Sequence, residues 1–175
     1  MFSKEEINRY QRQIIMPEID LKGQTALKNA KVLVIGAGGL GAPILLYLAA
    51  AGIGKIGIVD PDTVDISNLH RQVLYNTDDI GLLKVNCAAK KIRRLNPHIK
   101  TQTFAIALSS ENAMEIVSDY DIIIDGTDNF PTRYLINDVC VFENKIHIYG
   151  SIFRFEGQVS VFNNIDNKGI RGPNY

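Results

Sequence analysis

A glycine-rich turn at residues 36–41 is the first feature of this sequence that could do chemistry. Gly36, Gly38 and Gly41 match the pattern G-x-G-x-x-G, between an apolar stretch typical of a strand and one typical of a helix. Glycines let the backbone approach a phosphate closely, and the start of the following helix favours an anion. Asp60, nineteen positions after Gly41, ends the next predicted strand, where a carboxylate can bind ribose hydroxyls. Together these residues predict a nucleotide site.

A second polar segment, residues 61–82, is too long for an ordinary connection, and long loops in compact domains are often functional. Asn68, Arg71 and Gln72 in this loop could reach a triphosphate beyond the glycine turn. Lys84 begins the next predicted helix and could add a positive charge. The alternative is that Arg71 and Lys84 are solvated surface charges. The glycine pattern alone does not separate NAD from ATP, but a dehydrogenase has no obvious need for this second cationic loop.

A third polar loop, residues 125–133, follows an isoleucine-rich stretch. Its Asp128 would lie at the same sheet edge as the glycine turn, where a hard oxygen ligand beside a triphosphate suits Mg²⁺. Two alternatives stay open: Asp128 caps a helix that begins near Thr132, or Asp125 closes a turn.

The elements that must position these loops alternate along the chain. Strands are predicted at 31–35, 55–59, 99–106, 120–125, 145–149 and 157–162. Helices are predicted at 4–14, 24–29, 40–51, 84–95, 110–118 and 132–143, with a capping box of Ser3 and Glu6 on the first. This alternation predicts an α/β fold: a doubly wound, mostly parallel sheet with helices on both faces, and an antiparallel last strand. The three loops should then meet at the carboxyl ends of the strands.

Composition narrows the class of protein. The chain has 175 residues, is 46% hydrophobic and carries no net charge, which argues against disorder and against non-specific nucleic-acid binding. Residues 32–54 lack charge, but glycines and Pro43 interrupt them, so we expect a buried strand, turn and helix rather than a membrane span. Cys87 and Cys140 lie on apolar helix patterns and are expected to be buried core thiols in a reducing, cytoplasmic setting.

An ordered set of short motifs extends over nearly the whole chain. The motifs are Arg9-Tyr10-x-Arg12-Gln13, Gly36-x-Gly38-Gly39-x-Gly41, Asp60-x-Asp62-x-Val64, Ser67-Asn68-Leu69-x-Arg71-Gln72, Gly81-x-x-Lys84, Asn96-Pro97, Thr127-Asp128-Asn129 and Glu156-Gly157-Gln158. In this order they resemble the ThiF/MoeB/HesA family, whose nucleotide-binding fold is shared by ubiquitin-activating enzymes. The resemblance implies a Rossmann-like ATP-binding domain at 31–162, after a helical arm at 1–30.

The resemblance implies an adenylyltransferase that uses ATP and Mg²⁺. Its partner would be a small ubiquitin-like sulfur-carrier protein of the ThiS or MoaD type, with a C-terminal Gly-Gly. The terminal carboxylate would attack the α-phosphorus of ATP and release pyrophosphate, for sulfur transfer in thiamine or molybdopterin biosynthesis. Such a step needs alignment and positive charge rather than a protein nucleophile. Neither nucleic acid nor a membrane is expected as a partner.

The resemblance also implies a role for each motif residue. The nucleotide would be held by Gly36, Gly38, Gly39, Gly41, Asp60, Asp62, Asn68 and Gln72, with Asp60 on the ribose and Gln72 orienting its loop. Arg71 and Lys84 would stabilise phosphate charge, and Asp128 would bind Mg²⁺. Arg12 would reach the ATP site of a partner protomer in a homodimer.

The sequence departs from the family pattern at its end. Zinc-binding members carry Cys-x-x-Cys where this chain reads Gly172-Pro-Asn-Tyr175, so a zinc site is not expected, and residues 163–175 are expected to begin a truncated C-terminal part. Two other functions stay open. An NAD(P)-dependent oxidoreductase is supported by the glycine turn and Asp60 only. An inactive fragment or binding module of the same fold would keep the motifs without turnover.

Overall fold

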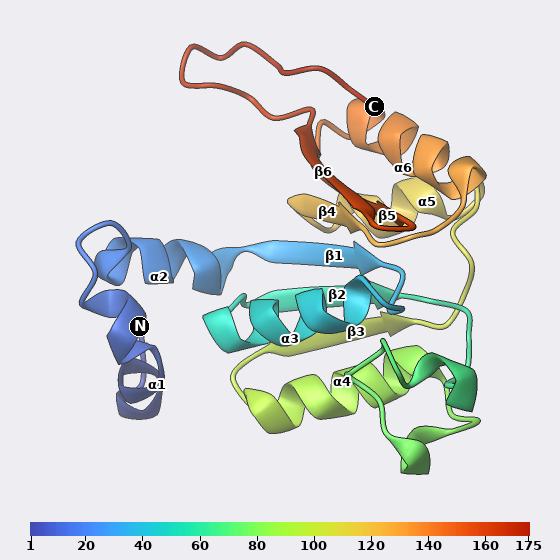
Figure 1. The fold of residues 1–175 in the computed structure, drawn as a ribbon. Coiled ribbons are helices and arrows are strands. Elements are labelled where there is room, and N and C mark those ends of the chain that lie inside the picture. The colour runs from blue at the N-terminus through green and yellow to red at the C-terminus, as the bar shows by residue number, and fades with distance from the viewer.

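A computed structural model describes all 175 residues and contains one six-stranded sheet (Figure 1). The strands are β1 (Lys31–Ile35), β2 (Lys55–Val59), β3 (Lys100–Phe104), β4 (Ile122–Asp125), β5 (Ile146–Phe153) and β6 (Glu156–Phe162). Their spatial order is β3-β2-β1-β4-β5-β6. The first five strands pair in parallel, and β6 pairs antiparallel with β5. The predicted doubly wound sheet with an antiparallel last strand is confirmed.

Helices cover both faces of the sheet, as Figure 1 shows. They are α3 (Gly41–Ala51) and α4 (Lys84–Leu95) on one face, and α5 (Ala113–Ser118) and α6 (Phe130–Phe142) on the other. Successive side chains of β1 point to opposite faces, so Val32 and Val34 pack with α3 and α4, whereas Leu33 and Ile35 pack with α5 and α6. Burial on both faces explains why this central strand is uniformly apolar.

The chain reverses its winding direction beside β1, and this places the polar loops together. Gly36 N–H donates to the carbonyl of Val59 at the end of β2, and Gly126 N–H donates to the carbonyl of Ile35 at the end of β1. The loops after β1, β2 and β4 therefore leave the same edge of the sheet. In open α/β sheets this reversal point is where ligands bind.

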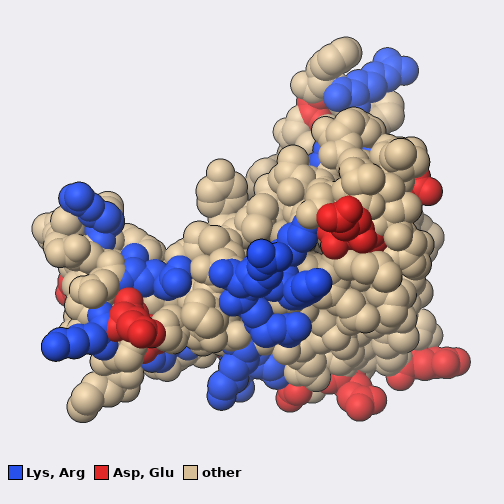
Figure 2. Space-filling model, turned by 90° about the horizontal axis from the view of Figure 1, so that it is seen from below, with Lys and Arg blue, Asp and Glu red and all other residues tan.

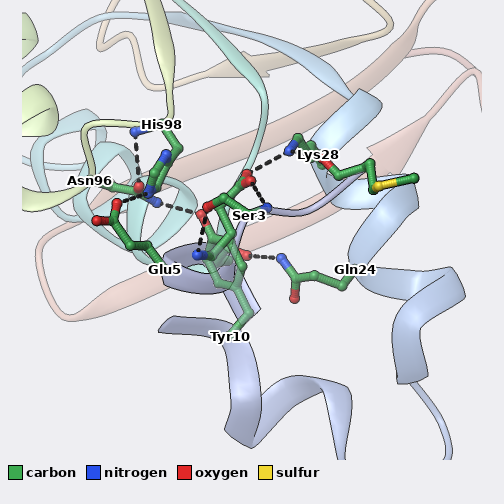
Figure 3. Close-up of polar contacts among 10 residues, drawn as sticks. Ser3, Glu5, Tyr10, Gln24, Lys28, Asn96 and His98 are labelled. Carbon is green, nitrogen blue, oxygen red and sulfur yellow. Dashed lines mark hydrogen bonds and ion pairs between the residues drawn. The ribbon is translucent and has the colours of Figure 1, made fainter. Parts of the chain in front are cut away.

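The N-terminal arm consists of α1 (Lys4–Ile14) and α2 (Asp20–Asn29) and contacts the C-terminal ends of α3 and α4. Figure 3 shows the contacts: Asn96 Nδ2 donates to the Tyr10 hydroxyl at 2.7 Å, and Gln24 Nε2 donates to the carbonyl of Ala51 at 3.0 Å. Gly52 allows this close approach, because a Cβ there would lie 2.7 Å from the Tyr10 ring. The capping box of Ser3 and Glu6 is confirmed.

Several element boundaries differ from those expected. Helix α5 begins at residue 113 rather than 110, because residues 109–112 form a turn in which Ser109 N–H donates to Asn112 Oδ1. Helix α6 begins at Phe130, two residues early, because Asn129 is its N-cap. Helix α2 begins at residue 20 rather than 24, and β5 continues to Phe153 because β6 pairs with it along the hairpin.

The last residues return to the body of the domain. Residues 163–175 form an extended loop beyond β6, seen in red in Figure 1, and Asn163 N–H donates to the carbonyl of Pro173 across it. Tyr175 packs on Tyr149, with ring centroids 4.9 Å apart. No helix of the structure combines the length and the apolar character needed to cross a membrane. Figure 2, viewed from below relative to Figure 1, shows basic side chains gathered on one part of that face, while the chain as a whole is neutral.

Candidate functional site

A cavity of about 710 Å³ opens where the loops after β1, β2, β3 and β4 meet. Its lining brings together most of the residues that the sequence pointed to: Gly36, Gly38, Gly39, Asp60, Asp62, Asn68, Arg71, Gln72, Lys84 and Asp128. These residues come from three loops and the start of α4. The cavity has the size typical of sites for small molecules.

The glycine turn needs its glycines for different reasons. Gly36 has a φ of +90°, and a Cβ there would lie 2.8 Å from the carbonyl oxygen of Gly126. Gly41 does not line the cavity, but a Cβ there would lie 1.8 Å from the carbonyl oxygen of Gly36. Gly41 therefore allows α3 to start directly against the turn. Gly38 and Gly39 present bare backbone to the cavity, where a phosphate can approach closely.

Asp60 ties the glycine turn to the second loop. Its side chain is buried, Oδ2 accepts from the backbone N–H of Ala37 at 2.8 Å, and Oδ1 accepts from the N–H of Asp62 at 2.9 Å. Each carboxylate oxygen can accept more than one hydrogen bond. Asp60 can therefore fix the turn and still accept from a ribose hydroxyl.

Lys84 lies in the cavity wall and pairs with Asp62, a contact that the sequence does not predict. Its ammonium nitrogen is 2.7 Å from Oδ2 of Asp62 and 4.0 Å from Oδ1 of Asp60, and the side chain is almost fully buried. Lys84 is thus not the solvated surface charge of the alternative interpretation. It compensates the charge of two carboxylates that border the cavity.

Arg71, in contrast, is exposed and has no carboxylate within ion-pair distance. Its side chain extends along Gly39, and Nη1 is 3.5 Å from Nε2 of the neighbouring His70. Gln72 is buried and donates from Nε2 to Oδ1 of Asn68 at 2.8 Å. Oε1 of Gln72 has no hydrogen-bond partner. This loop therefore offers a free guanidinium and polar atoms to an anion in the cavity.

In the third loop, residues 125–133, the structure shows which residue caps the helix and which one closes the turn. Asn129 caps α6 by accepting from Thr132 N–H at 3.0 Å, so Asp128 is not the cap. Asp125 closes the turn by accepting from the N–H of Thr127 at 2.8 Å and from its hydroxyl at 2.6 Å. Asp128 remains exposed at the cavity, where it is free to bind a metal ion.

Arg133 also lines the cavity, although no motif in the sequence indicates a role for it. It is 8% exposed, donates from Nη2 to the carbonyl of Thr127 at 2.9 Å, and donates from Nη1 to the Tyr149 hydroxyl at 3.3 Å. The only signal in the sequence is an arginine at the end of the Asp128 loop.

Arg12 was expected at a nucleotide site but does not line the cavity of its own chain. It lies exposed on α1.

The donor set fits a nucleotide with Mg²⁺. Gly38 and Gly39 expose their backbone to the cavity. The guanidinium of Arg71 and the carboxylate of Asp128, neither of which is in an ion pair, line the same cavity. No group of three His, Cys, Asp or Glu residues could hold a metal ion by protein ligands alone. Mg²⁺ is commonly held by one or two carboxylates together with substrate phosphates and water, which is what Asp128 could provide.

Comparisons with known proteins identify relatives of high sequence identity. A protein of Porphyra purpurea named "Probable molybdopterin-synthase adenylyltransferase" is 60% identical over 162 residues, covering 93% of this chain and 42% of that protein. A "Sulfur carrier protein adenylyltransferase" of Thermus thermophilus is 49% identical over 174 residues, covering 99% of this chain and 64% of that protein. The chain thus spans less than two thirds of these relatives.

Solved structures show the same fold. The crystal structure of PaaA has a TM-score of 0.82 at 32% identity, covering 92% of this chain and 52% of that one. E. coli MccB crystallised with ATP has a TM-score of 0.69 at 32% identity, covering 73% of this chain and 38% of that one. The sequence profile of the ThiF family matches residues 10–172, nearly the whole length. The chain belongs to the ThiF family.

Proposed function

We propose that this chain carries the ATP-binding site of an adenylyltransferase that activates the C-terminal glycine of a small ubiquitin-like sulfur-carrier protein. The observation that carries the proposal is the convergence, in one cavity, of the glycine turn, the free guanidinium of Arg71 and the unpaired carboxylate of Asp128. An NAD(P)-dependent oxidoreductase would use the turn and Asp60 but has no evident use for the other two. Two similar proteins are named adenylyltransferases, one of them for a sulfur carrier.

The reaction needs charge and alignment from the protein. An oxygen of the carrier's terminal carboxylate attacks the α-phosphorus of ATP, the bond from this phosphorus to the bridging oxygen breaks, and pyrophosphate leaves. Arg71 and Lys84 border the cavity and would stabilise the negative charge of the phosphates. Mg²⁺ held by Asp128 would neutralise phosphate charge further. The glycine turn and Asp60 would fix the nucleotide so that the attack is in line.

Arg12 fits a composite site in a homodimer. It is exposed on α1, in an arm whose position is fixed by Tyr10 and Gln24, and it is absent from the cavity of its own chain. We therefore assign Arg12 to the nucleotide of a partner protomer. Both cysteines are free thiols, which suits a reducing cytoplasm as the place of the reaction.

Calorimetric titration of the chain with Mg²⁺–ATP, with NAD⁺ as the parallel ligand, tests the proposal. We expect binding of ATP that weakens when Mg²⁺ is removed, and no binding of NAD⁺. Binding of NAD⁺ but not ATP would overturn the proposal in favour of an oxidoreductase. Exchange of labelled pyrophosphate into ATP that depends on an added carrier protein then tests the adenylation step itself.

A further inference from the structure

Asp125 and His147 form a buried pair behind the nucleotide cavity. They lie on the neighbouring strands β4 and β5, and both side chains are fully buried. Nε2 of His147 is 3.8 Å from Oδ2 of Asp125. Neither ring nitrogen of His147 has a hydrogen-bond partner, and neither does Oδ2 of Asp125. Buried ionisable groups are costly unless they compensate one another, so each is the evident partner of the other.

The other oxygen of Asp125 holds the loop that carries Asp128. Oδ1 accepts from both the backbone N–H and the hydroxyl of Thr127. The carbonyl of Thr127 in turn accepts from Arg133 on α6, and Thr127, Asp128 and Arg133 all line the cavity. A change in the charge or orientation of the Asp125 carboxylate is therefore transmitted to the backbone directly before Asp128.

Among the groups around the buried Asp125 carboxylate, His147 is the one that can compensate its charge. No other Lys, Arg or His nitrogen lies within 4.0 Å of Asp125. Arg133, packed above the sheet on α6, is engaged with Thr127 and Tyr149 instead. Burial, with a further contribution from Asp125, raises the pKa of the Cys140 thiol on α6 to about 12, so this group stays neutral. The His147 ring also lies beside the ring of Phe162 on β6, with centroids 5.7 Å apart, and this neighbour carries no charge.

We propose that His147 is a positioning residue of the nucleotide site, which acts through Asp125 and Thr127 on the placement of Asp128. It touches neither nucleotide nor metal; it keeps a buried carboxylate compensated, so that Asp125 can hold Thr127 in one orientation. The inference rests on the proposed function, because it gives the Asp128 loop the task of binding Mg²⁺–ATP. Its specific consequence is that the apparent affinity for Mg²⁺–ATP depends on the charges of residues 125 and 147 as a pair.

A double-substitution experiment tests this dependence. His147→Leu leaves Asp125 without its partner, whereas Asp125→Asn combined with His147→Leu removes both ionisable groups and keeps an amide oxygen that can accept from Thr127. His98→Leu is the matched control, because His98 lies in the arm contact next to Glu5, away from the cavity. Mg²⁺–ATP binding is measured by calorimetry, and KM for Mg²⁺–ATP, KM for the carrier and kcat are measured in the exchange reaction.

We expect His147→Leu to weaken Mg²⁺–ATP binding by about 10- to 100-fold, as loss of a group that orients a metal ligand commonly does. We expect the double variant to recover most of this loss and KM for the carrier to stay unchanged. Native affinity in His147→Leu would overturn the inference while leaving the proposed function intact, and so would equal losses in the single and double variants, which indicate packing alone.

If His147→Leu does not fold, His147→Gln alone and with Asp125→Asn gives the same comparison. Failure of the unsubstituted chain to bind Mg²⁺–ATP would overturn the proposed function and this inference with it.

Discussion

The ammonium group of Lys84 lies 2.7 Å from the carboxylate of Asp62 and 4.0 Å from that of Asp60. The lysine is buried, whereas the Asp62 side chain is mostly exposed at the rim of the cavity. A triphosphate that enters this cavity meets two carboxylates whose repulsion is offset by one lysine. We therefore expect Lys84 to have two effects on a bound triphosphate: it would attract the phosphates directly and offset the charge of the two carboxylates beside them.

We expect Lys84→Met to weaken Mg²⁺–ATP binding by at least about tenfold, or about 1.4 kcal/mol, because the lysine then no longer attracts the phosphates or offsets the charge of the two carboxylates. Calorimetric titration measures the change directly. Asp62→Asn combined with Lys84→Met should bind more tightly than Lys84→Met alone, since one repelling charge is gone. Equal affinity of the single and double variants would show that Asp62 does not act on the phosphates through charge.

Arg71 should matter for catalysis and little for stability. Its guanidinium is exposed and has no carboxylate partner, so Arg71→Ala breaks no ion pair and removes only a surface contact along Gly39. We expect carrier-dependent ATP–pyrophosphate exchange to fall by about 100-fold or more, the usual effect of removing a group that stabilises transition-state charge. The midpoint of thermal unfolding should stay unchanged. Arg94→Ala, an exposed arginine on α4 outside the cavity, is the control, and a comparable loss of exchange in Arg94→Ala would contradict the assignment.

Asp128 and Asn129 are adjacent but should affect different properties. Asn129 caps α6, so Asn129→Ala should lower the free energy of unfolding by about 1 kcal/mol. Asp128 makes no such bond, so Asp128→Ala should unfold like the parent chain but lose the effect of Mg²⁺ on ATP binding. Urea unfolding and titrations with and without Mg²⁺ separate the two. An Asp128→Ala chain whose ATP binding still responds to Mg²⁺ would remove this residue as the metal ligand.

The fold could be predicted from the sequence because its signals are local. Uncharged apolar stretches, glycines at fixed spacing and the capping box of Ser3 and Glu6 each specify structure within a few residues, and the structure confirms them. The cavity could be predicted because parallel strands end at one edge, so loops 36–41, 60–72 and 125–133 must meet there. The family motifs then pointed to the side chains that line it.

The contacts between these side chains could not be predicted in the same way. Asp62 and Lys84 are far apart in sequence, and only the path of the intervening loop brings the lysine onto the carboxylate. Asp125 and His147 meet because β4 and β5 pair in a particular register, which a single sequence does not encode locally. His147 looked like one polar residue in an apolar strand, and its partner became visible only across the sheet.

The ion pair between Glu6 and Lys28 should make the stability of the N-terminal arm depend on pH. Burial raises the pKa of Glu6, but the bonds from Lys28 and from Ser3 N–H outweigh it, and the pKa lies below its ordinary value of 4.5. Because the folded value is lower than the unfolded one, ionised Glu6 stabilises the fold above about pH 4.5, and this contribution is lost as the pH falls through the folded value. We expect Glu6→Gln to lower the free energy of unfolding by roughly 0.5–1 kcal/mol at pH 7, with the difference shrinking toward pH 3. Urea unfolding from pH 7 to pH 3 measures this difference in the free energy of unfolding, and Glu5→Gln, at an exposed position, is the control. A difference that stays constant with pH would exclude the ionised carboxylate of Glu6 as its cause.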